Sequence, residues 1–466
     1  MKKLIFKNTL LYSIPDIITK LLPFITLPIV TRYLTIDEIG LIGIYGIVIA
    51  LYSLFSQFGV AYVINSQWFK LSIKNREVLL YNLFLIGIIL SFLAIILFLI
   101  IKNLITPLAI GDNWDNLKNL TPFILIQVFF AGVKSLFDSF MIITRNVILV
   151  LKLSIFTVVI NTTLFLYMVI ITSDIFYILG TQALIASFIG IIYSYIILKN
   201  CRFKFNKYFW YKTFFISYPI YIRSLFNFIR NRYDKMYIAN ILGSANFAIY
   251  NFAFSVSSIL SLLGSAFDKS YSPLLIENIS KNEKDNSALS FMIFLYFVIM
   301  VTILIIFFFL GKPLINLISN SLFRESYDYI LLLFLNPLIS SFALSSGNIL
   351  IYYEKTKFIL FTTVVQALIT ISFIVLFVPI LGAKFAIISI LIGTLYYSTH
   401  QYMVSKKLFQ IELKENILII YSFLFSLIIF DKVYFHFINF NLLSCLFIIL
   451  YTFILCHLYY RYLRKY

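Results

Sequence analysis

Long apolar stretches separated by short polar segments run through the whole sequence of 466 residues. Most stretches are about 20 residues long, the length that an α-helix needs to cross the hydrocarbon core of a bilayer. They lack the strict alternation of apolar and polar residues that is typical of a membrane β-barrel. We therefore predict about fourteen transmembrane helices, over residues 10–31, 41–63, 79–101, 119–143, 153–171, 175–198, 213–238, 247–267, 289–310, 329–351, 358–380, 385–404, 417–431 and 438–458. The shortness of 417–431 and the slight turn at 144–152 leave twelve or thirteen spans open.

The composition supports this pattern. Hydrophobic residues make up 62% of the chain and charged residues only 12%, whereas a soluble domain is about half apolar. The first apolar stretch is long, contains three prolines and lacks a cleavage motif of small residues, so we predict a retained span and no cleaved signal. The fold class predicted is an all-α polytopic membrane protein.

The net charge of +18 reflects 37 Lys and Arg residues. Most of them fall in segments that would share one side of the membrane with the N-terminus, namely 2–7, 70–76, 145–152, 199–212, 269–284, 355–357, 406–414 and 461–465. The positive-inside rule then places both termini in the cytoplasm and removes the need for a nucleic-acid partner. The three Cys and three His residues lack metal-ligand spacing, so neither a metal nor a cofactor is expected.

An internal repeat divides the predicted spans. The stretch "RYLTIDEIGLIGIYG" (32–46) matches "NILGSANFAIYNFAF" (240–254) at an offset of about 208 residues, with Gly40 on Ala248. This predicts two six-helix lobes around a central cavity and two further C-terminal helices, as in transporters built from parallel repeats. The predicted parts are an N-terminal lobe at 1–198, a basic cytoplasmic linker at 199–212, a C-terminal lobe at 213–405 and the additional helices at 406–466.

The span at 213–238 contains charged residues that would be unfavourable in contact with lipid. At about 100° per residue, Arg223, Asn227, Arg230 and Asp234 fall within about 60° of one another. A charge at the centre of a bilayer costs roughly 2.5–3.5 kcal/mol, so this face should point inward. Arg230 and Asp234 stand four residues apart and could form an ion pair.

The spans at 10–31 and 119–143 also contain opposite charges at four-residue spacing. Asp16 and Lys20 are opposite charges at four-residue spacing, and so are Lys134 and Asp138. Internal neutralisation alone would explain such pairs, but ionisable groups within spans more often mark a transport pathway.

A surplus of Lys and Arg in a water-filled cavity favours an anionic cargo, because guanidinium and ammonium groups bind phosphate oxygens. The candidate cargo-binding residues are Arg223, Asn227, Arg230, Lys134 and Lys20. In the span at 329–351, Asn336, Ser340, Ala343 and Gly347 form one small, polar stripe, which either packs against a neighbouring helix or lines the cavity.

Two stretches carry a family resemblance. "NTLLYSIPDIITKLLPFITLPIVTRYLTIDEIGLIGIYG" (8–46) and "RYDKMYIANILGSANFAIYNFA" (233–254) resemble the opening motifs of the two halves of Wzx-type polysaccharide flippases. These belong to the multidrug, oligosaccharidyl-lipid and polysaccharide (MOP) export superfamily. The resemblance covers the first twelve spans in organisation. This chain departs from the motif in having Ala248 in place of Gly and Lys235 in place of Arg.

The resemblance implies a bundle that opens alternately to the two sides of the bacterial inner membrane. It would move an undecaprenyl-pyrophosphate-linked oligosaccharide of an O-antigen, lipopolysaccharide or capsule pathway to the outer leaflet, without enzymatic activity. Asp234 and Lys235 match the family's Asp-Arg pair. Asp16, Asp138 and Asp234 become candidates for proton or sodium coupling. The expected partners are the lipid-linked glycan, membrane lipid and other polysaccharide-assembly proteins.

Two alternatives stay open. A cation-coupled multidrug exporter of the same superfamily would need unpaired acids in its cavity. A polysaccharide polymerase would be expected to have a long external loop, and the longest predicted external segments here are 102–118 and 311–328.

Overall fold

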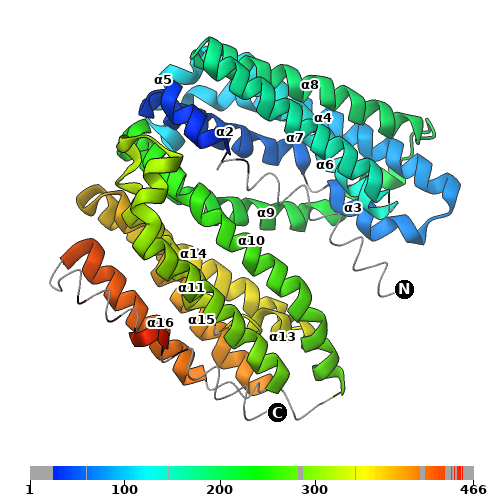
Figure 1. Ribbon diagram of the computed structural model, residues 1–466. Helices are drawn as coiled ribbons and strands as arrows, with labels where there is room; N and C mark the ends of the chain where they lie inside the picture. The colour runs from blue at the N-terminus through cyan, green and yellow to red at the C-terminus, as the bar shows by residue number, and fades with distance from the viewer. Residues whose placement is uncertain are drawn as a thin grey trace. The chain divides into compact units, whose positions relative to one another are not determined.

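The computed structural model describes residues 22, 25–58, 60–144, 146–281, 287–341, 343–409 and 415–435, together with 442, 446, 449–452 and 454. All regular structure in these residues is helical (Figure 1). The chain divides into two compact units, Met1–Asn251 and Phe252–Tyr466. The all-α fold class is confirmed, while the number of fourteen spans stays a prediction.

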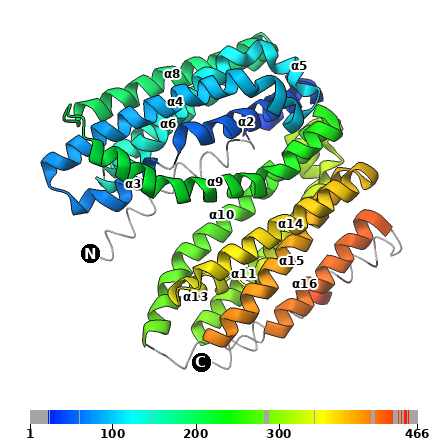
Figure 2. The same cartoon turned by 180° about the vertical axis from the view of Figure 1, so that it is seen from behind.

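The helices of unit 1 are α2 (Ile36–Gln57), α3 (Val60–Gln67), α4 (Ile73–Ile110), α5 (Asn113–Leu117), α6 (Thr121–Ile143), α7 (Val147–Ile171), α8 (Ile175–Lys199), α9 (Lys207–Ile241) and the first turns of α10 (Gly243–Lys281). Helix α6 packs against both α4 and α8, and α2 packs against both α4 and α6 (Figure 2). The aromatic rings of Phe137 and Tyr193 stack at a centroid distance of 4.2 Å where α6 meets α8.

Unit 2 contains the rest of α10 and the helices α11 (Ser287–Ile318), α12 (Ser326–Ser341), α13 (Ser346–Tyr352), α14 (Thr356–Leu381), α15 (Ala383–Leu408) and α16 (Glu415–Phe430). Helix α15 packs against α12, α13 and α14, and α16 packs against α12. A buried hydrogen bond of 2.9 Å between the hydroxyls of Ser405 and Ser346 joins α15 to α13.

Eight helical segments in the described part of the chain are long and apolar enough to cross a membrane. They lie in α2, α4, α5–α6, α7, α8, α10, α11 and α14. The pair α12 and α13, bent by 43°, would make a ninth. Helix α9 has 35 residues but is too polar for this set, because its sequence includes many charged, tyrosine and amide side chains. The protein is a multi-pass membrane protein.

Each predicted span coincides with a helix wherever its residues are described, but two spans are not continuous. The span at 41–63 ends in α2 at Gln57 and resumes in α3 at Val60. The span at 329–351 is broken between α12 and α13, on the small, polar stripe. Whether that stripe lines a cavity or only packs stays open.

Two segments that are predicted to lie on the same side of the membrane contact α9 and α10 at one end of unit 1. They are the segment between the first two predicted spans and the segment 102–118. The amide of Asn113 in α5 donates a hydrogen bond of 2.6 Å to the carbonyl of Ala239 in α9. The hydroxyl of Ser244 in α10 donates to the carboxylate of Asp37 in α2. This meeting agrees with the predicted alternation of the spans. Which side faces the cytoplasm stays a prediction.

Close approach of helix backbones explains why α2 packs so tightly. A Cβ atom on Gly40 would overlap the carbonyl oxygen of Ser244 in α10, and one on Gly132 in α6 would lie 2.8 Å from the carbonyl oxygen of Ser56 in α2. In lipid there is little hydrophobic driving force between helices, so van der Waals contact supplies much of the packing energy. Small residues such as glycine permit that close contact.

Candidate functional site

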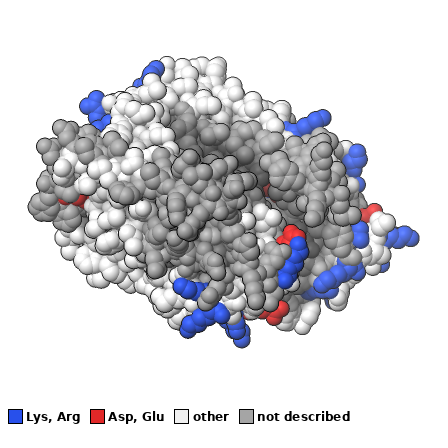
Figure 3. All heavy atoms as spheres, turned by 60° about the horizontal axis from the view of Figure 1, so that its bottom comes forward, with Lys and Arg blue, Asp and Glu red and all other residues white. Residues whose placement is uncertain are grey.

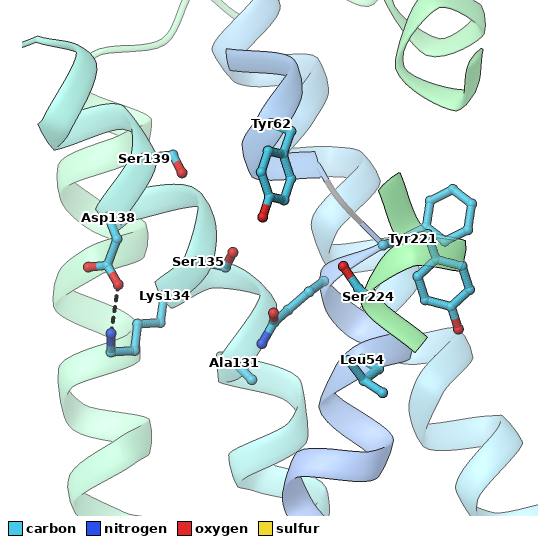
Figure 4. Close-up of a pocket in the computed structure, with 11 residues that line it drawn as sticks. Leu54, Tyr62, Ala131, Lys134, Ser135, Asp138, Ser139, Tyr221 and Ser224 are labelled. Atoms are coloured by element: carbon cyan, nitrogen blue, oxygen red, sulfur yellow. Dashed lines mark hydrogen bonds and ion pairs between the residues drawn. The ribbon is translucent and has the colours of Figure 1, made fainter. Parts of the chain in front are cut away.

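A pocket of about 570 Å³ lies among α2, α3, α6 and α9 of unit 1 (Figure 4). Its lining combines apolar, aromatic, hydroxyl, amide and charged side chains, namely Leu54, Gln57, Phe58, Tyr62, Ala131, Lys134, Ser135, Asp138, Ser139, Tyr221 and Ser224. Two of the lining residues were candidates from the sequence, Lys134 for cargo binding and Asp138 for ion coupling.

The break between α2 and α3 forms one wall of the pocket. Phe58 ends α2 with a left-handed backbone (φ 33°), a conformation that costs a residue with a Cβ roughly 1–2 kcal/mol. Its ring lies 4.7 Å from that of Tyr221 in α9, centroid to centroid. Tyr62, at the start of α3, is half exposed and points into the space between the helices (Figure 4).

Helix α6 supplies the opposite wall. Ala131, Ser135 and Ser139 follow one another at four-residue spacing, so they form one row along the helix. Lys134 and Asp138 form the adjacent row by the same spacing. One helix face therefore presents small hydroxyl groups beside a pair of opposite charges.

The predicted ion pair of α6 is confirmed. The ammonium of Lys134 lies 2.6 Å from a carboxylate oxygen of Asp138, with the side chains 58% and 37% exposed. Because both charges remain accessible, each can exchange its partner for a group on a bound molecule. The two charges offset each other, so this part of the pocket is polar without a net charge.

The remaining polar groups suit a ligand rich in hydroxyls. The amide of Gln57 and the hydroxyls of Ser135, Ser139 and Ser224 can each donate and accept hydrogen bonds. The rings of Phe58, Tyr62 and Tyr221 add apolar faces to the pocket, as in most small-molecule sites. Across the described residues, no three His, Cys, Asp or Glu side chains are placed to hold a metal ion.

Asp234 lies elsewhere in unit 1. It is 4% exposed and accepts a hydrogen bond of 2.6 Å from the hydroxyl of Tyr250, one helix further along the chain. The neighbouring Lys235 donates to the side-chain carbonyl of Asn251 at 3.2 Å. The two contacts join α9 to the first turns of α10.

The predicted pairing of Arg230 with Asp234 is wrong. No ion pair links these two described residues, and Arg230 lies 3.4 Å from the Asn231 side chain instead. The hydrogen bond of Asp234 is instead made with Tyr250 of another helix. Asn227 and Arg230 are partly buried and do not line the pocket.

Three predicted site residues receive no structural account. Asp16 and Lys20 lie outside the described residues. The backbone of Arg223 is helical within α9, but its side chain is not described. The eight predicted site residues are therefore divided. Two line the pocket, four lie on α9, and two lie outside the described residues.

Sequence reasoning missed most of the pocket. Gln57, Tyr62 and Tyr221 come from three different helices, and no spacing rule connects them. Ser135 and Ser139 could have been found, because each directly follows a charged residue that the sequence had already singled out.

The sequence matches the family model described as polysaccharide biosynthesis protein over residues 5–263. No curated protein matches the sequence significantly. Among solved structures, the lipid II flippase MurJ in an inward closed conformation gives a TM-score of 0.74 at 14% identity, covering 98% of this chain and 99% of that one.

Two transporters of the MOP superfamily are similar at lower scores. One, from Pyrococcus furiosus, is described as having a binding pocket of reverse polarity, with a TM-score of 0.57 at 14% identity and coverage of 88% and 96%. The other, a multidrug resistance transporter of the MATE family in an outward-facing conformation, gives 0.55 at 14% identity with the same coverage. At this identity the likeness concerns the fold. The chain therefore belongs to the polysaccharide biosynthesis protein family and has the fold of the MOP superfamily.

Proposed function

We propose that this protein is a flippase that moves an undecaprenyl-pyrophosphate-linked oligosaccharide from the cytoplasmic to the outer leaflet of the bacterial inner membrane. The observation that carries the proposal is the pocket among α2, α3, α6 and α9, which offers amide, hydroxyl and aromatic groups beside the Lys134–Asp138 pair. A glycan presents many hydroxyls and no charge of its own in its neutral sugars, and this lining matches that chemistry.

Within this proposal, the pocket holds part of the glycan. Lys134 donates to sugar oxygens or to an acidic sugar, and Asp138 accepts from sugar hydroxyls when the pair opens. The pyrophosphate needs a different set of groups, and Arg223, Asn227, Arg230 and Lys20 remain the candidates because phosphate oxygens bind guanidinium and ammonium groups strongly.

We further propose that the lobes at 1–198 and 213–405 open alternately around the cargo, with both termini in the cytoplasm. The linker at 199–212 would join the lobes, and the helices at 406–466 would be additional. The likeness of the fold to a lipid II flippase and to a transporter of the MOP superfamily supports this role over catalysis. Asp16, Asp138 and Asp234 remain candidates for ion coupling, although Asp234 would first have to release Tyr250.

The multidrug exporter is the competing function, since MATE transporters share the fold. The carboxylate of the described pocket has the ammonium of Lys134 beside it, and this positive charge would repel a bound organic cation. Transport of a cationic dye that is independent of lipid-linked glycan would favour the exporter.

The test is complementation of bacterial cells that lack their own repeat-unit flippase. The protein should restore surface polysaccharide and remove the lipid-linked repeat units that accumulate in the inner leaflet. A second arm deletes the protein from its own host. If unpolymerised single units then appear on the cell surface, the protein acts as a polymerase and the flippase proposal fails.

A further inference from the structure

The connection from α8 to α9 presents basic and aromatic side chains together. We call residues 199–211 the linker surface. Its exposed side chains are the basic Lys199, Arg202, Lys204 and Lys207 and the aromatic Phe203, Phe205, Tyr208 and Tyr211. The whole stretch 199–218 contains no Asp or Glu. Basic side chains also cover more of the face in Figure 3 than acidic ones do.

A buried asparagine fixes the shape of the linker surface. Asn82 in α4 is fully buried, and its amide nitrogen donates to the carbonyls of Val78 at 2.7 Å and Lys204 at 2.8 Å. Its side-chain oxygen accepts from the backbone N–H of Asn206 at 3.0 Å and from the indole N–H of Trp210 at 3.1 Å. The connection is therefore held against α4 at three points along the segment.

Ring contacts set the orientation of the aromatic side chains. Phe203 lies edge-on to Tyr81 of α4 at a centroid distance of 5.2 Å, and Phe205 lies 5.5 Å from Trp210. Despite these contacts Phe203 stays 70% exposed and Tyr211 67% exposed. Large apolar faces this exposed in water are unfavourable, but they are typical of the level of lipid headgroups.

The basic side chains lack an acidic neighbour on the same segment. Glu77 approaches from α4, where its backbone carbonyl accepts from the N–H of Arg202 at 3.2 Å. One carboxylate cannot offset the basic residues of the segment, so the linker surface carries a net positive charge. Positive charge beside exposed aromatic rings, at the end of the membrane-spanning helix α8, complements anionic headgroups.

We propose that the linker surface binds the phosphate headgroups of anionic phospholipids in the surrounding bilayer. Lys204 and Lys207 pair with the phosphates, while Phe203, Phe205 and Tyr211 lie among the headgroups and upper acyl chains. This inference does not depend on the identity of the transported molecule.

Trp210 provides a local probe of the lipid next to the linker surface. The full-length protein is placed in nanodiscs in which the same mole fraction of lipid carries dibrominated acyl chains, either on phosphatidylglycerol or on phosphatidylcholine. The part of the fluorescence quenching that disappears in Trp210→Phe belongs to Trp210. We expect bromine on phosphatidylglycerol to quench as if that lipid were enriched about fivefold, the effect of one basic residue at an anionic surface.

The double variant Lys204→Gln/Lys207→Gln should bring the two lipids close to equal quenching. The matched double variant Lys102→Gln/Lys118→Gln, at the other end of unit 1, should keep the preference. Raising the salt concentration should weaken the preference for phosphatidylglycerol in the unmodified protein. This second measurement tests the proposal even if the double variant does not fold. Equal quenching by both lipids in the unmodified protein, or a preference that survives both salt and the Lys204→Gln/Lys207→Gln change, would overturn the proposal.

Discussion

The ammonium of Lys134 and the carboxylate of Asp138 lie 2.6 Å apart on one face of α6, and both remain accessible from the pocket. An exposed pair of this kind contributes only about 0.3–0.5 kcal/mol to stability. We therefore expect Lys134→Met to leave the midpoint of thermal unfolding almost unchanged. Transport of lipid-linked glycan should fall about tenfold, the effect of losing one hydrogen bond to a charged group.

Glu277 and Lys281 of α10 provide the control for this change. They form an ion pair of 2.8 Å with the same spacing and similar exposure, but they do not line the pocket. Lys281→Met should leave both stability and transport unchanged. If the two lysine variants transport equally well, the Lys134–Asp138 pair has no role in cargo binding.

The backbone contact of α2 with α10 gives a prediction about stability. In Gly40→Ala, the new Cβ would overlap the carbonyl oxygen of Ser244, so the helices must separate. We expect a loss of about 1–3 kcal/mol, typical of overpacking. Gly46→Ala in the same helix has no atom within 4 Å of the new Cβ, and it should be neutral or stabilising. Equal thermal unfolding midpoints for the two variants would contradict the close approach.

The buried contact between Asp234 and Tyr250 should also affect stability. Tyr250→Phe removes the hydroxyl that donates to the buried carboxylate at 2.6 Å. An unsatisfied buried group costs about 1–3 kcal/mol, so the unfolding midpoint in detergent should fall clearly. Tyr195→Phe, which alters an exposed tyrosine of α8, should leave the midpoint unchanged. A stable Tyr250→Phe variant would show that the contact is dispensable.

Cys201, in the connection before α9, should be unusually unreactive. Burial, helped by the nearby Glu77 carboxylate, raises the pKa of its thiol to about 12. Because the reactive thiolate forms only near that pH, alkylation should accelerate about tenfold per pH unit from pH 7 to 10 without levelling off. The measurement uses Cys445→Ser/Cys456→Ser, so that only Cys201 reacts.

An ordinary thiol would show a different pH dependence of alkylation, because its rate would level off near pH 9. Glu77→Gln should speed the reaction of Cys201, since it removes the smaller of the two causes. The folded state holds the thiol proton more tightly than the unfolded state. The protonated thiol of Cys201 therefore makes its full contribution to the free energy of unfolding below the unfolded pKa of about 8.5. That contribution is lost as the pH rises toward 12.

The sequence was sufficient for features that depend on neighbours along one helix. The apolar stretches predicted the helices, and four-residue spacing predicted the contact of Lys134 with Asp138. Contacts between helices could not be predicted in this way. Asp234 of α9 accepts its hydrogen bond from Tyr250 of α10 rather than pairing with Arg230, and no local pattern reveals that contact.

The pocket needed the three-dimensional structure for the same reason. The break between α2 and α3 depends on the left-handed backbone of Phe58, and only the following Gly59 hints at it in the sequence. Gln57, Tyr62 and Tyr221 line one pocket because α2 and α3, on either side of that break, both pack against α6 and α9.

The most direct test of the central claim is photocrosslinking of the cargo from within the pocket. Benzoylphenylalanine replaces Tyr62, which lines the pocket and is 52% exposed, or Tyr167 of α7, which is 55% exposed and lies outside it. The protein is reconstituted with radiolabelled undecaprenyl-pyrophosphate-linked oligosaccharide and illuminated. The account predicts labelled protein from position 62 and little from position 167. Equal labelling at the two positions, or none at position 62, would contradict it.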